Sequence, residues 1–214
     1  MARNAHPEVT EQRILDAARE LFMEQGYEKT SVQDIVDRLG DLSKGAIYHH
    51  FKSKQTILDR LGDDDARRIG EQSKAVFERE DLDGLHKIRE LFKLSASDES
   101  HRDINRVAMP LLDDPTYFTD NMRFWSAELP KHFRPLIDEG VQDGSIPTEY
   151  PQEAAEMLAL LTNYWLLPHF YPATASQLEH RIRCLAAMLD AIGVPVFDDE
   201  LIAMTARLYT DFGG

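Results

Sequence analysis

Apolar residues recur at the 3.6-residue spacing of an α-helix along almost the whole chain. The first stripe lies between residues 9 and 25 and consists of Ile14, Leu15, Ala18, Leu21 and Phe22. The next stripe, within "SVQDIVDRLG", consists of Val32, Ile35, Val36 and Leu39. No segment keeps the strict alternation of apolar and polar residues that a half-buried strand requires. The sequence therefore predicts an all-α fold.

Capping residues set the expected starts of these helices. Ser31 or Thr30 can cap the second helix, and Ser43 is a good N-cap for a short third one. Asp114 followed by Pro115 marks a later helix start. We expect helices over residues 9–25, 31–39, 43–50, 53–80, 83–94, 102–112, from 115 onward, 152–168, 176–192 and 198–212.

Some residues are expected to interrupt the helices. Gly62 and Gly70 should weaken the fourth helix, because glycine is a poor helix former. The helix that begins at Pro115 should bend or break near Pro130 and Pro135. Polar loops are expected at "SASDES", residues 95–100, and at "GVQDGSIP", residues 140–147.

Length, cysteine content and hydropathy narrow the class of protein. A chain of 214 residues can form one substantial domain, or a small domain joined to a larger one. The single cysteine, Cys184, excludes an intramolecular disulfide and fits a reducing compartment. The N-terminal residues are polar, and the most apolar run, residues 157–171, is interrupted by Asn163 and Pro168. We therefore expect a cytoplasmic protein without a membrane span.

The whole chain has a formal net charge of −14, and the negative charge is concentrated in its C-terminal part. Residues 1–61 hold nine basic and ten acidic side chains, whereas residues 62–214 hold 15 basic and 28 acidic ones. This balance argues against a protein that coats nucleic acid nonspecifically, but it leaves room for a local contact surface. We expect two domains, which divide between residues 61 and 62.

One segment contrasts with this acidity: "SKGAIYHHFKSK", residues 43–54, holds three lysines and two histidines and no carboxylate. The second and third expected helices are joined by a short turn, which is the spacing of a helix-turn-helix motif. In that motif the second helix enters the major groove of DNA, where a carboxylate would repel the phosphates. The apolar faces of the N-terminal helices can form a small core from Leu15, Ala18, Phe22, Val32, Ile35, Val36, Leu39, Ile47 and Phe51.

Residues 14–61 resemble the DNA-binding domain of the TetR family of bacterial transcriptional regulators. The resemblance is carried by "ILDAA" at the start, by "GY" before the second helix and by "GAIYHHFKSK". One departure is the turn "GDLSKG", which is one residue longer than the Gly-Val-Ser form common in the family. The longer turn should change the tilt of the recognition helix.

The resemblance implies a set of DNA contacts. Phosphate contacts are expected from Ser31, Tyr48, Lys52 and Lys54, and base or groove contacts from Lys44, Gly45, His49 and His50. The helix N-terminus at Ser43 can also offer its free N–H groups to a phosphate. Tyr48 could instead pack against the small core, and His50 could be a solvated surface group. Arg3 is a further candidate for a minor-groove contact.

The resemblance also implies that the larger domain binds a small molecule and forms a homodimer. Apolar residues on two faces of the helix at 152–168 support a dimer independently, because such a helix is buried on two sides. The helix at 176–192 repeats the pattern, and the two could form a four-helix interface across a two-fold axis. Such a dimer places two recognition helices about 34–36 Å apart on a palindromic operator. The candidate interface residues are Leu158, Leu161, Ile182, Leu185 and Leu189.

Aromatic and methionine residues at helical spacing suggest a ligand-binding cavity, although the same pattern is typical of an ordinary core. The candidates are Phe92, Met109, Phe118, Met122, Trp125, Met157, Asn163, Trp165 and His169. Asn163 and His169 could orient a ligand or form hydrogen bonds within the dimer interface. An aromatic cavity with few polar groups favours a flat, apolar or cationic compound.

The predicted function is regulation of transcription. The resemblance implies a dimer that binds its operator, blocks transcription and releases the DNA when a ligand favours more widely separated recognition helices. An activator of the same fold is an alternative.

Two other classes are less favoured. The sequence lacks a glycine-rich phosphate loop and a nucleophile elbow, so it does not indicate an enzyme, and no cofactor is expected. His180 and Cys184 lie four residues apart but are too few for a metal site. A helical adaptor that does not bind DNA would leave the acid-free segment unexplained.

Overall fold

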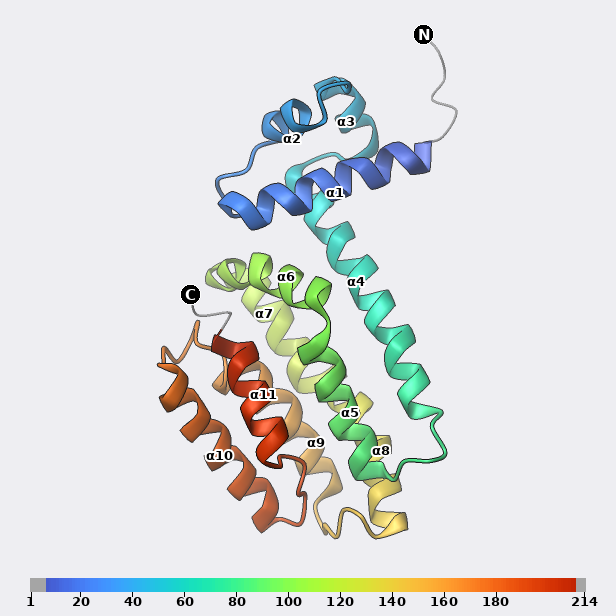
Figure 1. Ribbon diagram of the computed structural model, residues 1–214, viewed down its shortest axis with the longest axis vertical. Helices are drawn as coiled ribbons and strands as arrows, with labels where there is room; N and C mark the ends of the chain where they lie inside the picture. The colour runs from blue at the N-terminus through green and yellow to red at the C-terminus, as the bar shows by residue number, and fades with distance from the viewer. Residues whose placement is uncertain (1–6, 211–214) are drawn as a thin grey trace. The chain divides into compact units, whose positions relative to one another are not determined.

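The computed structural model describes residues 7–210, and the regular secondary structure of this range is entirely helical, as predicted (Figure 1). The α-helices are α1 (Pro7–Gln25), α2 (Val32–Leu39), α3 (Lys44–His50), α4 (Lys54–Phe77), α5 (Gly84–Ser97), α6 (Glu99–Ala108), α7 (Pro115–Arg123), α8 (Pro130–Asp143), α9 (Pro151–Leu160), α10 (Ala175–Ala191) and α11 (Asp199–Thr210). Three short segments are the 3₁₀-helix η1 (Met109–Asp113) and the π-helices η2 (Phe124–Glu128) and η3 (Leu161–Trp165).

Side-chain caps start several helices where the sequence indicated. Ser31 caps α2, and its hydroxyl and backbone N–H exchange hydrogen bonds with Asp34 in a capping box. Thr30 has a different role, because its buried hydroxyl donates to the Gly26 carbonyl over 2.8 Å. The Asp114 carboxylate caps α7, which has a proline in its first turn. Favourable capping therefore defines these boundaries.

Helix α4 continues through Gly62 and Gly70, and the weakening expected at these glycines stays a prediction. The predicted loop at 95–100 was wrong, because this segment is a helix junction. There Asp98 ends α5, and its carboxylate accepts a hydrogen bond from the His101 backbone N–H, so it satisfies the first turn of α6.

The proline and glycine signals further along had mixed outcomes. The break at Pro130 is confirmed, because α8 begins there directly after η2. Pro135, in contrast, lies inside α8 and is exposed, so it removes one backbone hydrogen bond without ending the helix. The expected loop at 140–147 begins too early, since α8 continues to Asp143 and ends at Gly144, whose φ is 86°.

The chain divides into two compact units. The first contains the described residues up to Arg68 together with Asp103–Ala108, and the second contains Ile69–Arg102 and the described residues from Met109. In the first unit, α1, α2, α3 and the beginning of α4 enclose a small core of Ile14, Leu15, Ala18, Phe22, Ile35, Ile47, Phe51, Ile57 and Leu61. Residues 61 and 62 both lie within α4.

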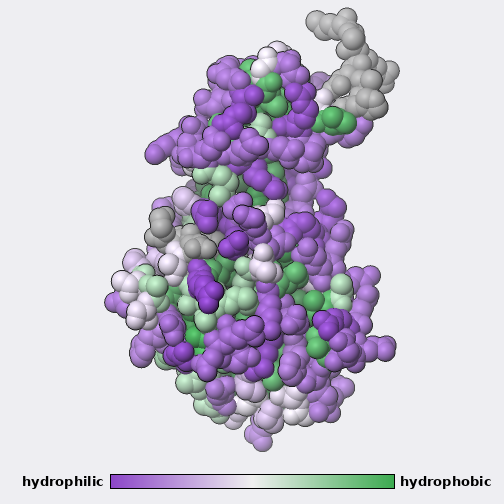
Figure 2. Space-filling model, viewed as in Figure 1, coloured by the Kyte–Doolittle hydropathy of each residue, from purple (hydrophilic) through white to green (hydrophobic). Residues whose placement is uncertain are grey.

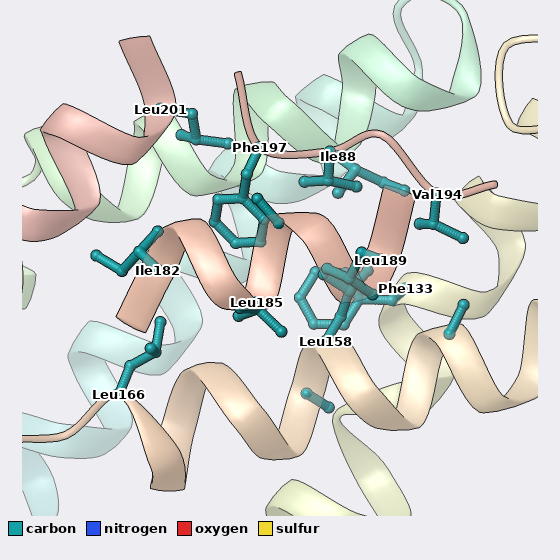
Figure 3. Close-up of a cluster of buried hydrophobic side chains, with 14 of the residues drawn as sticks. Ile88, Phe133, Leu158, Leu166, Ile182, Leu185, Leu189, Val194, Phe197 and Leu201 are labelled. Atoms are coloured by element: carbon teal, nitrogen blue, oxygen red, sulfur yellow. The ribbon is translucent and has the colours of Figure 1, made fainter. Parts of the chain in front are cut away.

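The second unit is a helical bundle in which α5, α8, α9, α10 and α11 pack around a larger apolar core. Figure 3 shows side chains from α5, α8, α9, α10 and α11 meeting in this core, among them Ile88, Phe133, Leu158, Leu185 and Leu201. On the face shown in Figure 2, hydrophilic side chains cover most of the surface, and smaller hydrophobic areas lie over the second unit.

Helices α5 and α8 approach each other through glycine. A Cβ atom added at Gly84 would lie 2.3 Å from the backbone nitrogen of Gly140 and 2.3 Å from the Leu136 carbonyl oxygen. The Asp143 carboxylate accepts a hydrogen bond from the Gly84 N–H over 2.8 Å, which ties the end of α8 to the start of α5. The glycine is therefore required by backbone contact.

We expect Gly84→Ala to lower the free energy of unfolding by about 1–3 kcal/mol or more, because overpacking against backbone has no rotamer escape. Gly70→Ala is the matched control: an added Cβ there has no neighbour within 4 Å. It should stabilise α4 by about 0.5–1 kcal/mol. Thermal unfolding followed by circular dichroism measures both. Equal midpoints for the two variants would contradict the close contact.

Candidate nucleic-acid interface

The turn between α2 and α3 has the geometry of a helix-turn-helix. Gly40 adopts a left-handed conformation with φ 74°, and its N–H donates to the Val36 carbonyl and closes α2. Ser43 is extended, and its hydroxyl accepts a hydrogen bond from the Ala46 N–H at the start of α3. The predicted cap at Ser43 is thus confirmed.

Helix α3 is attached to its unit by one fully buried side chain, Ile47. Lys44, Gly45, His49 and Lys52 are exposed, and His50 is half-buried. The rings of His49 and His50 meet edge to face with centroids 5.5 Å apart. The candidate contact residues of α3 are therefore available to solvent.

Tyr48 is 41% exposed, so it does not belong to the small core. Gly45 also lacks an internal reason for being glycine: a Cβ there would meet only the Ser43 hydroxyl oxygen, at 3.8 Å. Glycine inside a helix costs about 0.5–1 kcal/mol relative to alanine. Its presence fits a surface that another molecule approaches closely.

Lys54 has partners within the protein. Its Nζ donates to the Tyr27 carbonyl over 2.6 Å and to the Glu28 carbonyl over 3.4 Å, and it lies 4.0 Å from the centre of the Tyr27 ring. The Tyr27 hydroxyl donates to the Gln55 side chain over 2.8 Å. Burial raises the pKa of the Tyr27 phenol, which therefore stays a hydrogen-bond donor. These contacts join the α1–α2 turn to the first turn of α4.

Ion pairs hold α1 against the helix-turn-helix, and sequence reasoning did not find them. The Arg13 guanidinium forms two hydrogen bonds with the Asp41 carboxylate, and Arg38 contacts Glu20 and Glu24. The Arg13 hydrogen bond lowers the pKa of the Asp41 carboxyl. Asp41 lies in the turn whose extra residue the sequence had indicated, but its partner is 28 positions away and no local pattern links the two.

The candidate dimer residues lie mainly in the core of their own chain. Leu158, Ile182, Leu185 and Leu189 each have 0% exposure, and Leu161 is half-buried. This corrects the assignment of those four residues, because side chains enclosed within their own chain cannot face a partner, whereas the assignment of Leu161 stays a prediction. The apolar residues left at the surface of α9 and α10 include Met157, Leu160, Ala187 and Met188, together with the exposed Cys184.

The seven apolar candidate ligand residues all lie in the core of the second unit or against it. Met109 and Trp125 are buried in this core, and Phe92, Phe118, Met122, Met157 and Trp165 are partly buried against it. Phe92 stacks on Phe133 with ring centroids 5.8 Å apart. Phe118 also contacts an aromatic cluster of Tyr164, Phe170, Tyr171 and His169. The clustering of Phe170 and Tyr171 was missed, although "HFY" in the sequence was its signal.

The two polar candidates have partners within the chain. The Asn163 amide donates to the Ala159 carbonyl over 2.9 Å, and the Thr162 hydroxyl donates to the Leu158 carbonyl, so both satisfy backbone oxygens near η3. Tyr209 of α11 also donates to the Thr162 carbonyl, over 2.5 Å. His169 lies 3.1 Å from the Asp113 carboxylate. These groups stabilise the loop and π-helix around the aromatic cluster.

Other classes of site have little support in residues 7–210. Within that range no three His, Cys, Asp or Glu side chains are grouped as a metal site, so His180 and Cys184 gain no third ligand. No helix there is both long and apolar enough to cross a membrane. Arg3 and residues 211–212 of the last expected helix lie outside the described residues.

Known proteins resemble the chain in sequence. A family model described as "Bacterial regulatory proteins, tetR family" matches residues 14–61. The "HTH-type transcriptional repressor KstR2" of Rhodococcus jostii (strain RHA1) is 28% identical over 190 residues, which are 85% of this chain and 90% of the relative. The "HTH-type transcriptional repressor Rv1474c" of Mycobacterium tuberculosis is 36% identical over 129 residues, 58% of this chain and 62% of that relative.

A solved structure resembles the fold beyond the helix-turn-helix. The crystal structure of a transcriptional regulator of the TetR/AcrR family from Thermobifida fusca matches with a TM-score of 0.59 and 28% identity. The match covers 83% of this chain and 97% of that one. The similarity therefore includes much of the second unit.

We expect Lys54→Met to lower the free energy of unfolding by about 1–2 kcal/mol, because it removes a charged hydrogen bond and a cation–π contact but keeps the apolar stem. Lys52→Met is the control, since Lys52 is exposed and should change stability by less than about 0.5 kcal/mol. Urea unfolding measures both variants. Equal losses in the free energy of unfolding would show that Lys54 contributes no more to stability than the exposed Lys52.

Proposed function

The chain belongs to the TetR family of bacterial transcriptional regulators, and we propose that its homodimer represses transcription from a palindromic operator and releases it when an effector binds. Regulators of this family are not enzymes. The observation that carries the proposal is the carboxylate-free segment of residues 42–58, which contains the exposed side chains of α3, in a chain whose formal net charge is −14. Repression is favoured over activation because the two relatives described above are named repressors.

In this proposal the exposed face of α3 enters the major groove. Lys44, Gly45, His49 and His50 contact base edges, and the absent side chain of Gly45 allows close approach of the backbone. Phosphate contacts come from Ser31, Ser43, Tyr48, Lys52 and Lys54. Lys54 uses two of its three N–H groups on backbone carbonyls, which leaves one for a phosphate oxygen.

We place the dimer interface on the outer faces of α9 and α10. Met157, Leu160, Cys184 and Met188 support this placement, because Met157 and Leu160 are only partly buried and Cys184 and Met188 are exposed on these helices. A two-fold axis along these helices would bury them against their copies in a four-helix arrangement. Within the dimer, residues 1–61 would contact DNA and residues 62–214 would bind the effector.

The proposed effector is a flat apolar or cationic molecule. Its support is the partly exposed aromatic cluster, in which the Tyr164 and Phe170 ring centroids lie 4.8 Å apart and Phe118 lies 5.4 Å from Phe170. Aromatic faces attract both apolar rings and cations. The chain passes between the two units within α4 and again at both ends of residues 103–108, so α4 is one covalent connection through which binding would change the spacing of the recognition helices. A cytoplasmic location follows from this role.

Binding of purified protein to duplex DNA across a salt series tests the proposal. The probe is the DNA upstream of its own gene, with unrelated DNA for comparison. We expect tight, selective binding, and the logarithm of the binding constant should fall linearly with the logarithm of the salt concentration. Lys52→Ala should make this slope shallower by about 0.9, which is the contribution of one phosphate contact on duplex DNA.

Lys74→Ala is the control for this slope, because it removes the same charge from an exposed position in the second unit. Its slope should equal that of the wild type. If the wild type binds neither fragment at low salt, the DNA-binding proposal fails. If Lys52→Ala and Lys74→Ala share the wild-type slope, the contact surface is elsewhere.

Met188→Glu should convert the dimer to a monomer, because it would bury a charge at the proposed two-fold interface. Val141→Glu is the matched control: Val141 is 43% exposed on α8, and Met188 is 41% exposed on α10. Sedimentation velocity distinguishes the two outcomes. A dimeric Met188→Glu variant would refute this interface.

A further inference from the structure

The turn between α2 and α3 is short, and one of its side chains is bound by another helix. Gly40 closes α2 and Ser43 caps α3, so Asp41 and Leu42 alone lie between the two caps. Any rotation in these two residues changes the direction in which α3 leaves α2. The angle of the recognition helix therefore depends on what holds this turn.

Arg13 of α1 holds it with two parallel hydrogen bonds. Its Nη2 lies 2.7 Å from Asp41 Oδ1, and its Nη1 lies 3.0 Å from Oδ2. A two-pronged pair of this kind fixes orientation as well as distance. The next residue along α1, Ile14, is fully buried, so the backbone that carries Arg13 is anchored in the core.

The pair is too exposed to matter much for global stability. The side chains of Arg13 and Asp41 are 43% and 58% exposed, and exposed ion pairs contribute little to the free energy of unfolding. A role for this pair is therefore to be sought in the geometry of the turn rather than in the stability of the fold.

The pair also balances the negative charge of Asp41, which lies directly before the acid-free segment. Asp41 is the last carboxylate before the acid-free segment, which extends from residue 42 to 58. Without a partner, this negative charge would stand two residues before the Ser43 cap of α3 and would repel phosphates there. Arg13 supplies the balancing positive charge from a different helix.

We propose that Arg13 and Asp41 are positioning residues: their ion pair fixes the angle at which α3 is presented to DNA and so sets operator selectivity. This inference rests on the proposed function. A positioning role and a purely electrostatic role predict opposite changes in the affinity of the Asp41→Asn variant for the selected duplex. Asp41→Asn removes a negative charge near DNA, which by electrostatics alone should tighten binding to any sequence.

The experiment uses the full-length protein and a duplex that the wild type selects from a random-sequence pool, with a scrambled duplex of equal composition. The variants are Arg13→Gln, Asp41→Asn and the double variant. Each should bind the selected duplex at least about fivefold more weakly, the effect of misplacing one base contact. The double variant should lose no more affinity than the weaker-binding of the two single variants, because each single substitution already removes the same ion pair.

Binding to the scrambled duplex separates geometry from charge. There, Asp41→Asn should bind as tightly as the wild type or slightly more tightly, so that only the ratio between the two duplexes falls. Asp37→Asn is the control with the same charge change, because Asp37 is exposed on α2 and its partner Gln33 lies on the same helix. Asp37→Asn should keep the wild-type ratio. Arg13→Lys should keep more of the wild-type ratio between the two affinities than Arg13→Gln, because lysine keeps the positive charge but cannot form the two-pronged hydrogen bonds of arginine.

Hydrogen exchange gives a readout that does not need DNA. Arg13→Gln should exchange faster at the amides of residues 40–46 while the thermal midpoint stays within about 2 °C of the wild type. The proposal is overturned if Asp41→Asn tightens binding to both duplexes and the double variant matches the wild type. Unchanged exchange at the turn would also overturn it. If the wild type selects no sequence at all, the proposed function fails together with this inference.

Discussion

The burial of Ile47 is the contact on which the candidate interface depends. Helix α3 has seven residues, and an isolated helix of that length is not stable in water. Its order comes from the Ser43 cap, from the N–H of Phe51 that closes its end, and from Ile47 in the small core. Because one side chain provides the anchor, the remaining positions of α3 are free to be polar. The core formed by α1, α2 and α4 thus determines which groups α3 can present.

Charge is arranged around this helix by pairing. The first unit contains many carboxylates, and several of them are bound by arginines of neighbouring helices: Asp41 by Arg13, Glu24 by Arg38, and Glu11 by Arg60. Arg13 and Arg38 lower the pKa values of Asp41 and Glu24, so these carboxylates stay ionised while their charge is balanced locally. Residues 42–58 contain Lys44, Lys52 and Lys54 but no carboxylate. A nearly neutral unit can therefore carry a positive face.

Much of the fold could be predicted from the sequence because local signals agree. The apolar stripe of α1, the caps at Ser31, Ser43 and Asp114, and the start of α8 at Pro130 are all local properties. The sequence also indicated that Lys44 and His49 of α3 face solvent. It failed where the outcome depends on distant residues. Leu158 and Leu185 belong to apolar stripes, but periodicity cannot say whether α11 or a second chain covers them.

The long-range polar contacts were beyond sequence reasoning for the same reason. Lys54 reaches a carbonyl 27 positions away, and Arg13 pairs with a residue 28 positions away. Both were invisible to patterns that extend over one or two helical turns. The aromatic cluster around Tyr164 was not predicted, because the loop after η3 decides which rings meet.

The crossing of α5 and α8 has a consequence for how this sequence can drift over evolutionary time. At Gly84 the neighbouring atoms are backbone, which cannot rotate away as a side chain can, so the position is closed to every residue with a Cβ. A Cβ at Gly62 or Gly70 would have no neighbour within 4 Å, so other residues can replace these glycines without a steric clash. Among descendants that keep this crossing, glycine at 84 should therefore persist long after the glycines of α4 have been replaced.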